Sequence, residues 1–188
     1  MITNDTLHTI KNRRSIRSFT DEQIKEEELQ AVLESGVYAP SAANQQAWHF
    51  TVIQNKDLLA WLNREAKETA KTFDDEHIRL MANNEKLNIF YGAPTVILVS
   101  GKEDAMVIES DCAAANQNML LAAESIGLGS CWVNLVLFLF HHPKAKEYIA
   151  ELGIPDGYKP YCSVALGYKK TKIVNAPARK PNRINYIR

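Results

Sequence analysis

One continuous apolar stretch, Ala93–Ser100, limits most strongly what this chain can fold into. Its centre is a run of β-branched and aliphatic residues, without the polar alternation of a strand that has one face in water. We therefore expect a strand that is buried on both faces. The rest of the chain must then supply covering elements for both sides of a sheet.

The length of the chain suits one well-buried core. The sequence has 188 residues, of which 46% are hydrophobic and 23% are charged, and this is too short for two domains of ordinary size. We expect a single domain over residues 1–188. The 22 Lys and Arg residues balance the 22 Asp and Glu residues, so no net field favours nucleic acid or an anionic membrane.

The cysteines indicate a reducing compartment. Cys112, Cys131 and Cys162 are odd in number and far apart, and none has the Cys or His neighbours of a zinc site. The first residues lack the pattern of a secretory leader, and the longest apolar run, Leu135–Phe140, is too short to span a membrane. We expect a soluble cytoplasmic protein without a metal site, in which Cys131 is a packed core thiol.

The remaining elements follow from periodicity and from turn residues. Trp48–Ile53 is expected to be a strand because of its β-branched and aromatic content. Thr20–Gln23 is interpreted as a capping box that starts a helix ending at Gly36. The other expected elements are a short helix over 4–12, two helices with a mobile join over 56–81, a long helix over 103–126, a short helix over 143–152 and a strand over 161–168.

The first basic cluster, residues 13–19 (RRSIRSF), brings three guanidinium groups and two hydroxyls into seven residues. Guanidinium groups bind phosphate oxygens with paired, charge-assisted hydrogen bonds. By itself the cluster is equally compatible with a solvated basic surface. A polar loop at Pro40–Trp48 and a basic tail at Arg179–Pro181 favour a ligand, because the three segments together suit one phosphorylated, amide-bearing ring.

A glycine-rich stretch, Gly127–Leu135, follows the long helix. Two glycines end the helix and allow the backbone to approach a planar group closely, after which the chain enters another strand. Glycines that end helices are common, so this stretch is informative only in combination with the others.

In order and spacing, six segments of the sequence resemble the FMN-dependent nitroreductase family. They are RRSIRSF, PSAANQQAWHF, FYGAPTVILV, GLGSCW, ALGY and ARKP, and they extend over almost the entire chain. The resemblance implies an α+β fold in three layers, with a mixed, mostly antiparallel central sheet flanked by helices. It also implies that the C-terminal tail extends onto a partner subunit.

The resemblance implies a homodimer in which each FMN site is formed by residues of both subunits. Arg13 and Arg179 would contact the FMN phosphate with Ser15 beside them, and Arg17 would lie near the pyrimidine edge of the flavin. A guanidinium there stabilises the negative charge of the reduced ring. Ser41 and Asn44 would reach the ribityl chain and phosphate from the partner. The full set of expected FMN-binding residues is Arg13, Arg14, Ser15, Arg17, Pro40, Ser41, Ala42, Asn44, Trp132, Val133, Asn134, Leu135 and Arg179.

The sequence departs from the family pattern in three places. Ala47 stands where the family usually has proline before the tryptophan. The tail leaves three candidates for the phosphate ligand, which are Arg179, Lys180 and Arg183. The asparagine that faces the pyrimidine edge in many members could be Asn84 or Asn88.

The activity that the resemblance implies is hydride transfer from NAD(P)H through FMN to a nitroaromatic, quinone or related acceptor, in a ping-pong sequence. The cofactor carries this chemistry, so no side chain is expected to act as a catalytic acid or base. The absence of a GxGxxG motif after a strand argues against a separate dinucleotide-binding domain. A specialised relative, such as a reductive dehalogenase or an enone reductase, and a flavin-binding or sensing protein without turnover stay open. Segments 65–90 and 138–142 are expected to cover the pocket.

Overall fold

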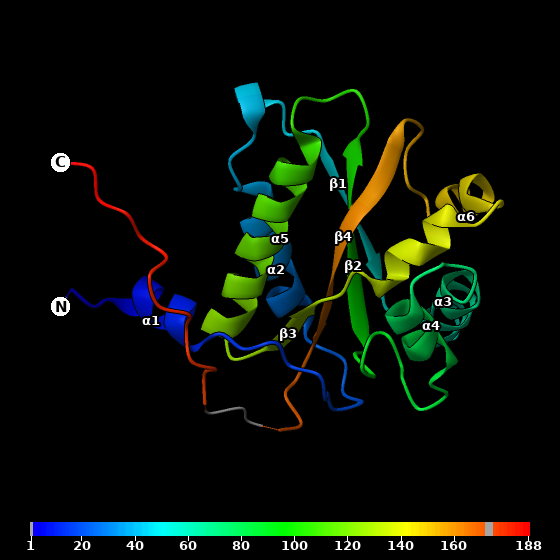
Figure 1. Cartoon of the computed structure of the whole chain (residues 1–188), viewed down its shortest axis with the longest axis horizontal. Coiled ribbons are helices and arrows are strands. Elements are labelled where there is room, and N and C mark those ends of the chain that lie inside the picture. The colour runs from blue at the N-terminus through cyan, green and yellow to red at the C-terminus, as the bar shows by residue number, and fades with distance from the viewer. Residues whose placement is uncertain (1, 172–174) are drawn as a thin grey trace.

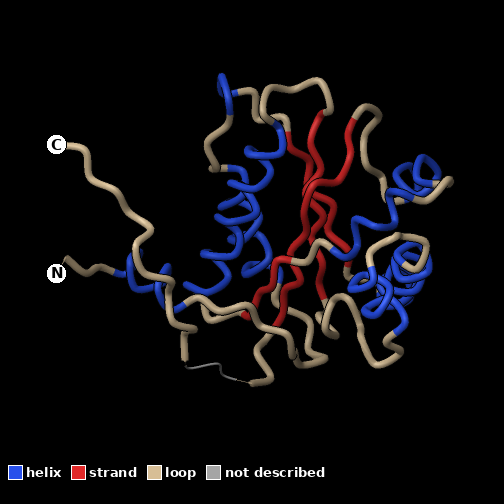
Figure 2. Tube along the Cα trace, viewed as in Figure 1, coloured by secondary structure: helices blue, strands red, loops and turns tan. Residues whose placement is uncertain are grey.

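The structure is a computed structural model that describes residues 2–171 and 175–188. Four strands form its centre in the order β1-β2-β4-β3 (Figure 2). Every strand pairing in the described sheet is antiparallel, and the one parallel pairing is an isolated bridge between Ser15 and Ser130. The strands are β1 (Trp48–Ile53), β2 (Thr95–Lys102), β3 (Gly129–Trp132) and β4 (Tyr158–Gly167).

Helices cover both faces of the sheet, which confirms the expected three-layer α+β architecture (Figure 1). On one side lie α2 (Glu26–Val37) and α5 (Ile108–Ser125), with α1 (Asp5–Asn12) at the end of α5. On the other side lie α3 (Lys56–Ala70), α4 (Glu76–Asn83), the 3-10 helix η2 (Leu135–His141) and α6 (Ala145–Glu151). A further 3-10 turn, η1 (Ala42–Asn44), precedes β1.

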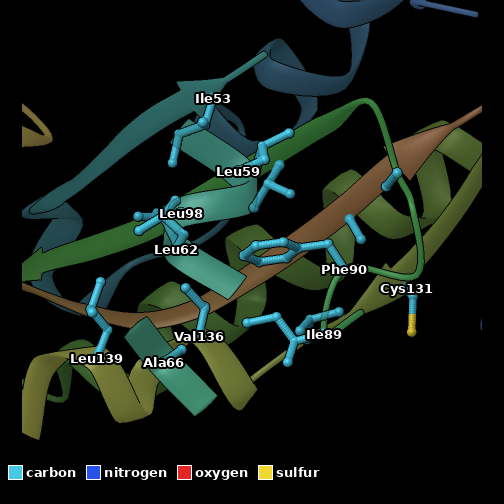
Figure 3. Close-up of a cluster of buried hydrophobic side chains, with 14 of the residues drawn as sticks. Ile53, Leu59, Leu62, Ala66, Ile89, Phe90, Leu98, Cys131, Val136 and Leu139 are labelled. Carbon is cyan, nitrogen blue, oxygen red and sulfur yellow. The ribbon is translucent and has the colours of Figure 1, made fainter. Parts of the chain in front are cut away.

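The expectation that β2 is covered on both faces is confirmed. All residues from 95 to 101 are buried. Val96 and Leu98 point into the core on the α3 and η2 side, which is shown with Leu62 and Val136 in Figure 3. Ile97 and Val99 belong to the second core, with α2 and α5. The absence of polar alternation in this strand is therefore explained by two separate hydrophobic cores.

The expected helix start at Thr20–Gln23 is wrong. α2 begins at Glu26, where the Lys25 amide donates to Glu28 Oε2 at 2.9 Å. The segment before it is extended, because the Thr20 amide bonds to the Tyr168 carbonyl at 3.0 Å and the Gln23 side chain donates to Thr95. Contacts with β2 and with the end of β4 thus override the local capping pattern. The arginine cluster lies in the extended segment between α1 and α2.

The start of the long helix also differs from the expectation. α5 begins at Ile108 rather than near residue 103. The Glu103 amide donates to the Gly157 carbonyl at 2.9 Å, and Val107 adopts a left-handed φ of 40° just before the helix. The chain therefore passes through a turn between β2 and α5. No helix in the described part of the chain is long and apolar enough to cross a bilayer.

Asn116 is an unusual residue in the middle of α5. Its side chain is 0% exposed, and neither its amide nitrogen nor its oxygen has a hydrogen-bond partner among the described residues. A buried polar group without a partner costs about 1–3 kcal/mol. Leucine has nearly the same shape as asparagine, so Asn116→Leu is expected to raise the free energy of unfolding by about 1–2 kcal/mol, measured by urea denaturation.

The matched control for this prediction is Leu120→Asn. Leu120 lies one turn further along α5, belongs to the same core and is 2% exposed. This substitution creates the unpaired group that the first one removes, so it is expected to lower the free energy of unfolding. A loss of stability in Asn116→Leu would show that the amide is paired in solution.

Candidate functional site

The arginine cluster is held against β3 by two buried apolar side chains. Ile16 and Phe19 are 2% and 5% exposed, and the Ile16 amide donates to the Ser130 carbonyl at 2.9 Å. Gly129 allows this approach, because a Cβ there would lie 3.0 Å from Ile16 Cγ2. Ser15 pairs with Ser130 in the parallel bridge. The residues between these anchors are thereby fixed beside the edge strand of the sheet.

The positive charges of the cluster affect the pKa of the Cys131 thiol in β3. Burial raises the pKa of this thiol, while the charges of Arg17 and Arg13 and a hydrogen bond with Ser15 act in the opposite direction. Three of the expected site residues therefore act on the same thiol of β3. Cys131 itself is 1% exposed within the apolar core, as expected for a packed thiol.

The three arginines differ in what they bind. Arg14 Nη1 donates to the carbonyls of Lys11 and Arg13 at 2.8 and 2.7 Å, so this guanidinium caps the end of α1. Arg13 Nη1 and Arg14 Nε are both buried and have no hydrogen-bond partner among residues 2–171 and 175–188, and for Arg13 no hydrogen bond from another atom of the guanidinium is seen there. Arg17 lies over the ring of Tyr91, with its Cζ 5.7 Å from the ring centroid. A buried guanidinium donor without a partner fits an anion such as a phosphate group.

The stretch Trp132–Leu135, which we call the crossing stretch, leads from β3 to η2 on the other side of the sheet. Trp132 Nε1 donates to Asn134 Oδ1 at 2.7 Å, and the Val133 amide donates to the Ser163 carbonyl at 2.9 Å. η2 begins directly afterwards, at Leu135. The four expected residues of this stretch are thus held by β4 and by their own side chains, next to the arginine cluster in space.

The polar loop at 40–46 is attached to the opposite end of α5. The Ala42 amide lies 3.2 Å from both carboxylate oxygens of Asp111, in the first turn of α5. Within the loop, Ser41 Oγ accepts from the Gln46 amide at 3.0 Å, and Asn44 Oδ1 accepts from the Gln46 side chain at 2.9 Å. Ala43, Asn44 and Gln46 all have positive φ values, near 50°. Such strain persists where the surrounding contacts define the conformation, and it is common at ligand sites.

The chain does not bring this loop to its own arginine cluster. α5 has 18 residues, which at 1.5 Å per residue is about 27 Å. The loop packs at the start of this helix. β3 comes after the end of the helix, and the arginine segment lies beside β3 at that end (Figure 1). The expected site residues therefore form two groups at opposite ends of one helix.

The tail residues form a third group. Arg179, Lys180 and Arg183 are exposed in an extended segment that leaves the body of the molecule beside α1 (Figure 1). The apolar side chains at its end are also uncovered, with Ile184 74% and Ile187 95% exposed. No contact among the described residues shows which of these three residues is the phosphate ligand.

A groove of about 580 Å³ lies beside Trp132, with residues of α5 on one side and residues of η2 and α6 on the other. It is lined by the outer part of β4 and by η2 and α6, and its residues include Trp132, Leu137, Phe140, His141 and Tyr161. Phe140 and His141 come from the expected covering segment 138–142, whereas no residue of segment 65–90 lines this groove. That second segment packs instead on Phe138 and Leu135 through α3 and α4.

Comparison with known proteins identifies the family. The profile of the Nitroreductase family matches residues 10–168. The chain belongs to the nitroreductase family. A nitroreductase from Bacteroides fragilis, solved with bound FMN, is 38% identical with a TM-score of 0.91, over 99% of this chain and 100% of that one. An FMN-bound nitroreductase from Desulfitobacterium hafniense is 30% identical with a TM-score of 0.90, and the match covers all of both chains.

A curated relative of this nitroreductase-family chain comes from Archaeoglobus fulgidus. That protein is named as a candidate NADH dehydrogenase/NAD(P)H nitroreductase, and it is 31% identical over 88% of this chain and 86% of its own length. The family expectation from the sequence is therefore confirmed.

Two residues of the candidate site were missed in the sequence. Asp111 fixes the polar loop, and the sequence held no signal for it, because the helix was expected to begin at residue 103 and only the structure places Asp111 in its first turn. Tyr91 faces Arg17, and the adjacent Gly92, with a φ of 74°, was the sign of a turn there. Asn84 and Asn88 both lie in the segment before this turn, where their side chains accept from the amides of Lys86 and Phe90.

Proposed function

We propose that this chain is an FMN-dependent oxidoreductase that passes hydride equivalents from NAD(P)H to a nitroaromatic, quinone or related acceptor. The observation that carries the proposal is the Nη1 atom of Arg13, a buried guanidinium donor without a partner among the described residues, next to Ser15 and the edge of β3. Bound FMN would supply the hydride chemistry at its flavin ring. The FMN-bound nitroreductases with closely similar folds support this assignment.

In this proposal the residues of the chain bind and orient the cofactor. Arg13 and Ser15 hold the phosphate, and Arg14 supports them by capping α1. Arg17 faces the pyrimidine edge of the flavin. The crossing stretch, Trp132–Leu135, lies along the ring and presents its backbone to it. The tail supplies a further basic group, for which Arg179 is the proposed residue.

We propose that the site is completed in a homodimer. Pro40, Ser41, Ala42 and Asn44 lie at the opposite end of α5 from the arginine cluster of their own chain, and this helix is about 27 Å long. A second copy with its α5 reversed would place this loop beside the cluster, and the exposed tail would extend onto the same partner. The three free, buried cysteines suit a cytoplasmic location, which we also propose.

Anaerobic titration of the purified, FMN-loaded protein tests this function. We expect NADH or NADPH to bleach the flavin absorbance near about 450 nm, and a nitroaromatic or quinone to restore it. A yellow protein that neither nucleotide bleaches would contradict the reductase and favour a binding or sensing role. A protein that does not retain FMN would contradict the whole proposal.

A further inference from the structure

Tyr91 has a backbone conformation that its side chain does not favour. Its φ is 57°, in the left-handed region, although the residue is not glycine. A Cβ clashes with the following backbone in this region, so a bulky residue there signals a constraint imposed by its surroundings. The next residue, Gly92, has a φ of 74° and completes the turn into β2. The backbone of this turn is therefore strained at Tyr91, and the strain sets the direction of the Tyr91 side chain.

The turn is held from the α3 side by hydrogen bonds. The Tyr91 amide donates to the Asn88 carbonyl at 2.9 Å, and the Ile89 amide donates to Asn63 Oδ1 of α3 at 2.9 Å. Ile89 and Phe90 are both 2% exposed and anchor the segment in the core (Figure 3). Lys67, also on α3, donates to the carbonyl of Leu87 at 3.2 Å. The backbone that carries Tyr91 is therefore held by α3 and by the core, and the Tyr91 side chain packs, partly buried, against this core.

The group that this ring faces is the guanidinium of Arg17, 5.7 Å from the ring centroid. Arg17 is exposed, and no carboxylate pairs with it in the part of the chain that the structure describes. An arginine side chain has many rotamers and loses them only when something holds it. The attraction between a cation and the face of an aromatic ring is the interaction that can do so here.

We infer that Tyr91 is a positioning residue, which holds the Arg17 guanidinium in place for the pyrimidine edge of the flavin. This inference rests on the proposed function, because it requires FMN in the site. The pyrimidine edge gains negative charge when the flavin is reduced, so a fixed guanidinium stabilises the reduced form more than the oxidised form. Tyr91 thereby affects the electron affinity of the cofactor without contacting it.

The test compares Tyr91→Leu and Tyr91→Phe with the wild-type protein, all loaded with FMN. The measurements are the dissociation constant of oxidised FMN and the two-electron midpoint potential of the bound flavin. Loss of the ring is expected to reduce the preference for the reduced form about fivefold, which lowers the potential by about 20 mV. Phenylalanine keeps the ring face, so Tyr91→Phe is expected to have the wild-type potential.

Two further variants separate positioning from a structural effect. In an Arg17→Ala background, Tyr91→Leu is expected to cause no further change in potential, because the group that it positions is gone. Tyr38→Leu changes a tyrosine that is 77% exposed and is expected to have no effect. A wild-type potential in Tyr91→Leu, or an equal shift with and without Arg17, would overturn the inference. Wild-type protein that binds FMN but is not reduced by NAD(P)H would contradict the proposed function alone, since the potentials can still be compared.

Discussion

Arg13→Ala is expected to weaken FMN binding roughly 10- to 100-fold, because hydrogen bonds from a charged donor contribute about 1.5–3 kcal/mol. Arg13 Nη1 is buried and has no partner among the described residues, whereas Arg14, whose Nε is likewise buried without a partner there, already donates through Nη1 to carbonyls at the end of α1. The dissociation constant can be measured by adding the apo protein to FMN and following the quenching of flavin fluorescence. Arg13→Lys is expected to be intermediate, since lysine keeps the charge but not the paired donors.

Arg64→Ala is the matched control for this prediction. Arg64 is an exposed residue of α3 whose Nε lies 3.2 Å from Glu65, so the same change of charge is made away from the cluster. Its affinity for FMN is expected to equal that of the wild type. Equal affinities in Arg13→Ala and Arg64→Ala would remove the main support for a phosphate at this position.

The sequence predicted the central layer of this fold well, for a physical reason. An uninterrupted apolar run is stable only between two cores, so residues 93–100 indicated both the strand and its covering helices. The start of α2 was predicted wrongly because Thr20 and Gln23 bond to residues far along the chain, Tyr168 and Thr95. Local capping patterns compete with tertiary hydrogen bonds, and the sequence does not show which partner is near.

The candidate site was predictable in its residue types but not in its arrangement. Three guanidiniums in one segment indicated an anion, yet only the structure shows which donors lack a partner among the described residues, Arg13 Nη1 and Arg14 Nε, and that Arg14 Nη1 caps α1. Tyr91 could not be found, because left-handed strain at a tyrosine depends on its surroundings. The sequence also did not show that the polar loop and the cluster are far apart, because their separation depends on how α5 is placed between them in the fold.

Ser41→Asp is expected to abolish tight FMN binding if the polar loop of one subunit faces the phosphate in the other. The aspartate can still accept the hydrogen bond that Ser41 Oγ receives from the Gln46 amide, so the loop is expected to keep its shape. Its charge would then repel the phosphate. Within one chain, Ser41 and Arg13 lie at opposite ends of α5, and the length of this helix, about 27 Å, is well beyond the screening length of about 8 Å at physiological salt. A site made by a single chain would therefore be unaffected, and Ser41→Asn serves as the neutral control.

Mixing the two variants makes this test decisive. An Arg13→Ala homodimer and a Ser41→Asp homodimer each have two damaged sites. In a mixed dimer, one site carries both substitutions and the other carries neither, because each site takes its cluster from one chain and its loop from the other. Co-refolding equal amounts is therefore expected to restore wild-type affinity in about a quarter of the sites, by random pairing into dimers. Recovery of these sites would show that they are shared between subunits. A site made by a single chain would instead bind FMN tightly in every Ser41→Asp chain before mixing, and forming mixed dimers would not change the number of tight sites.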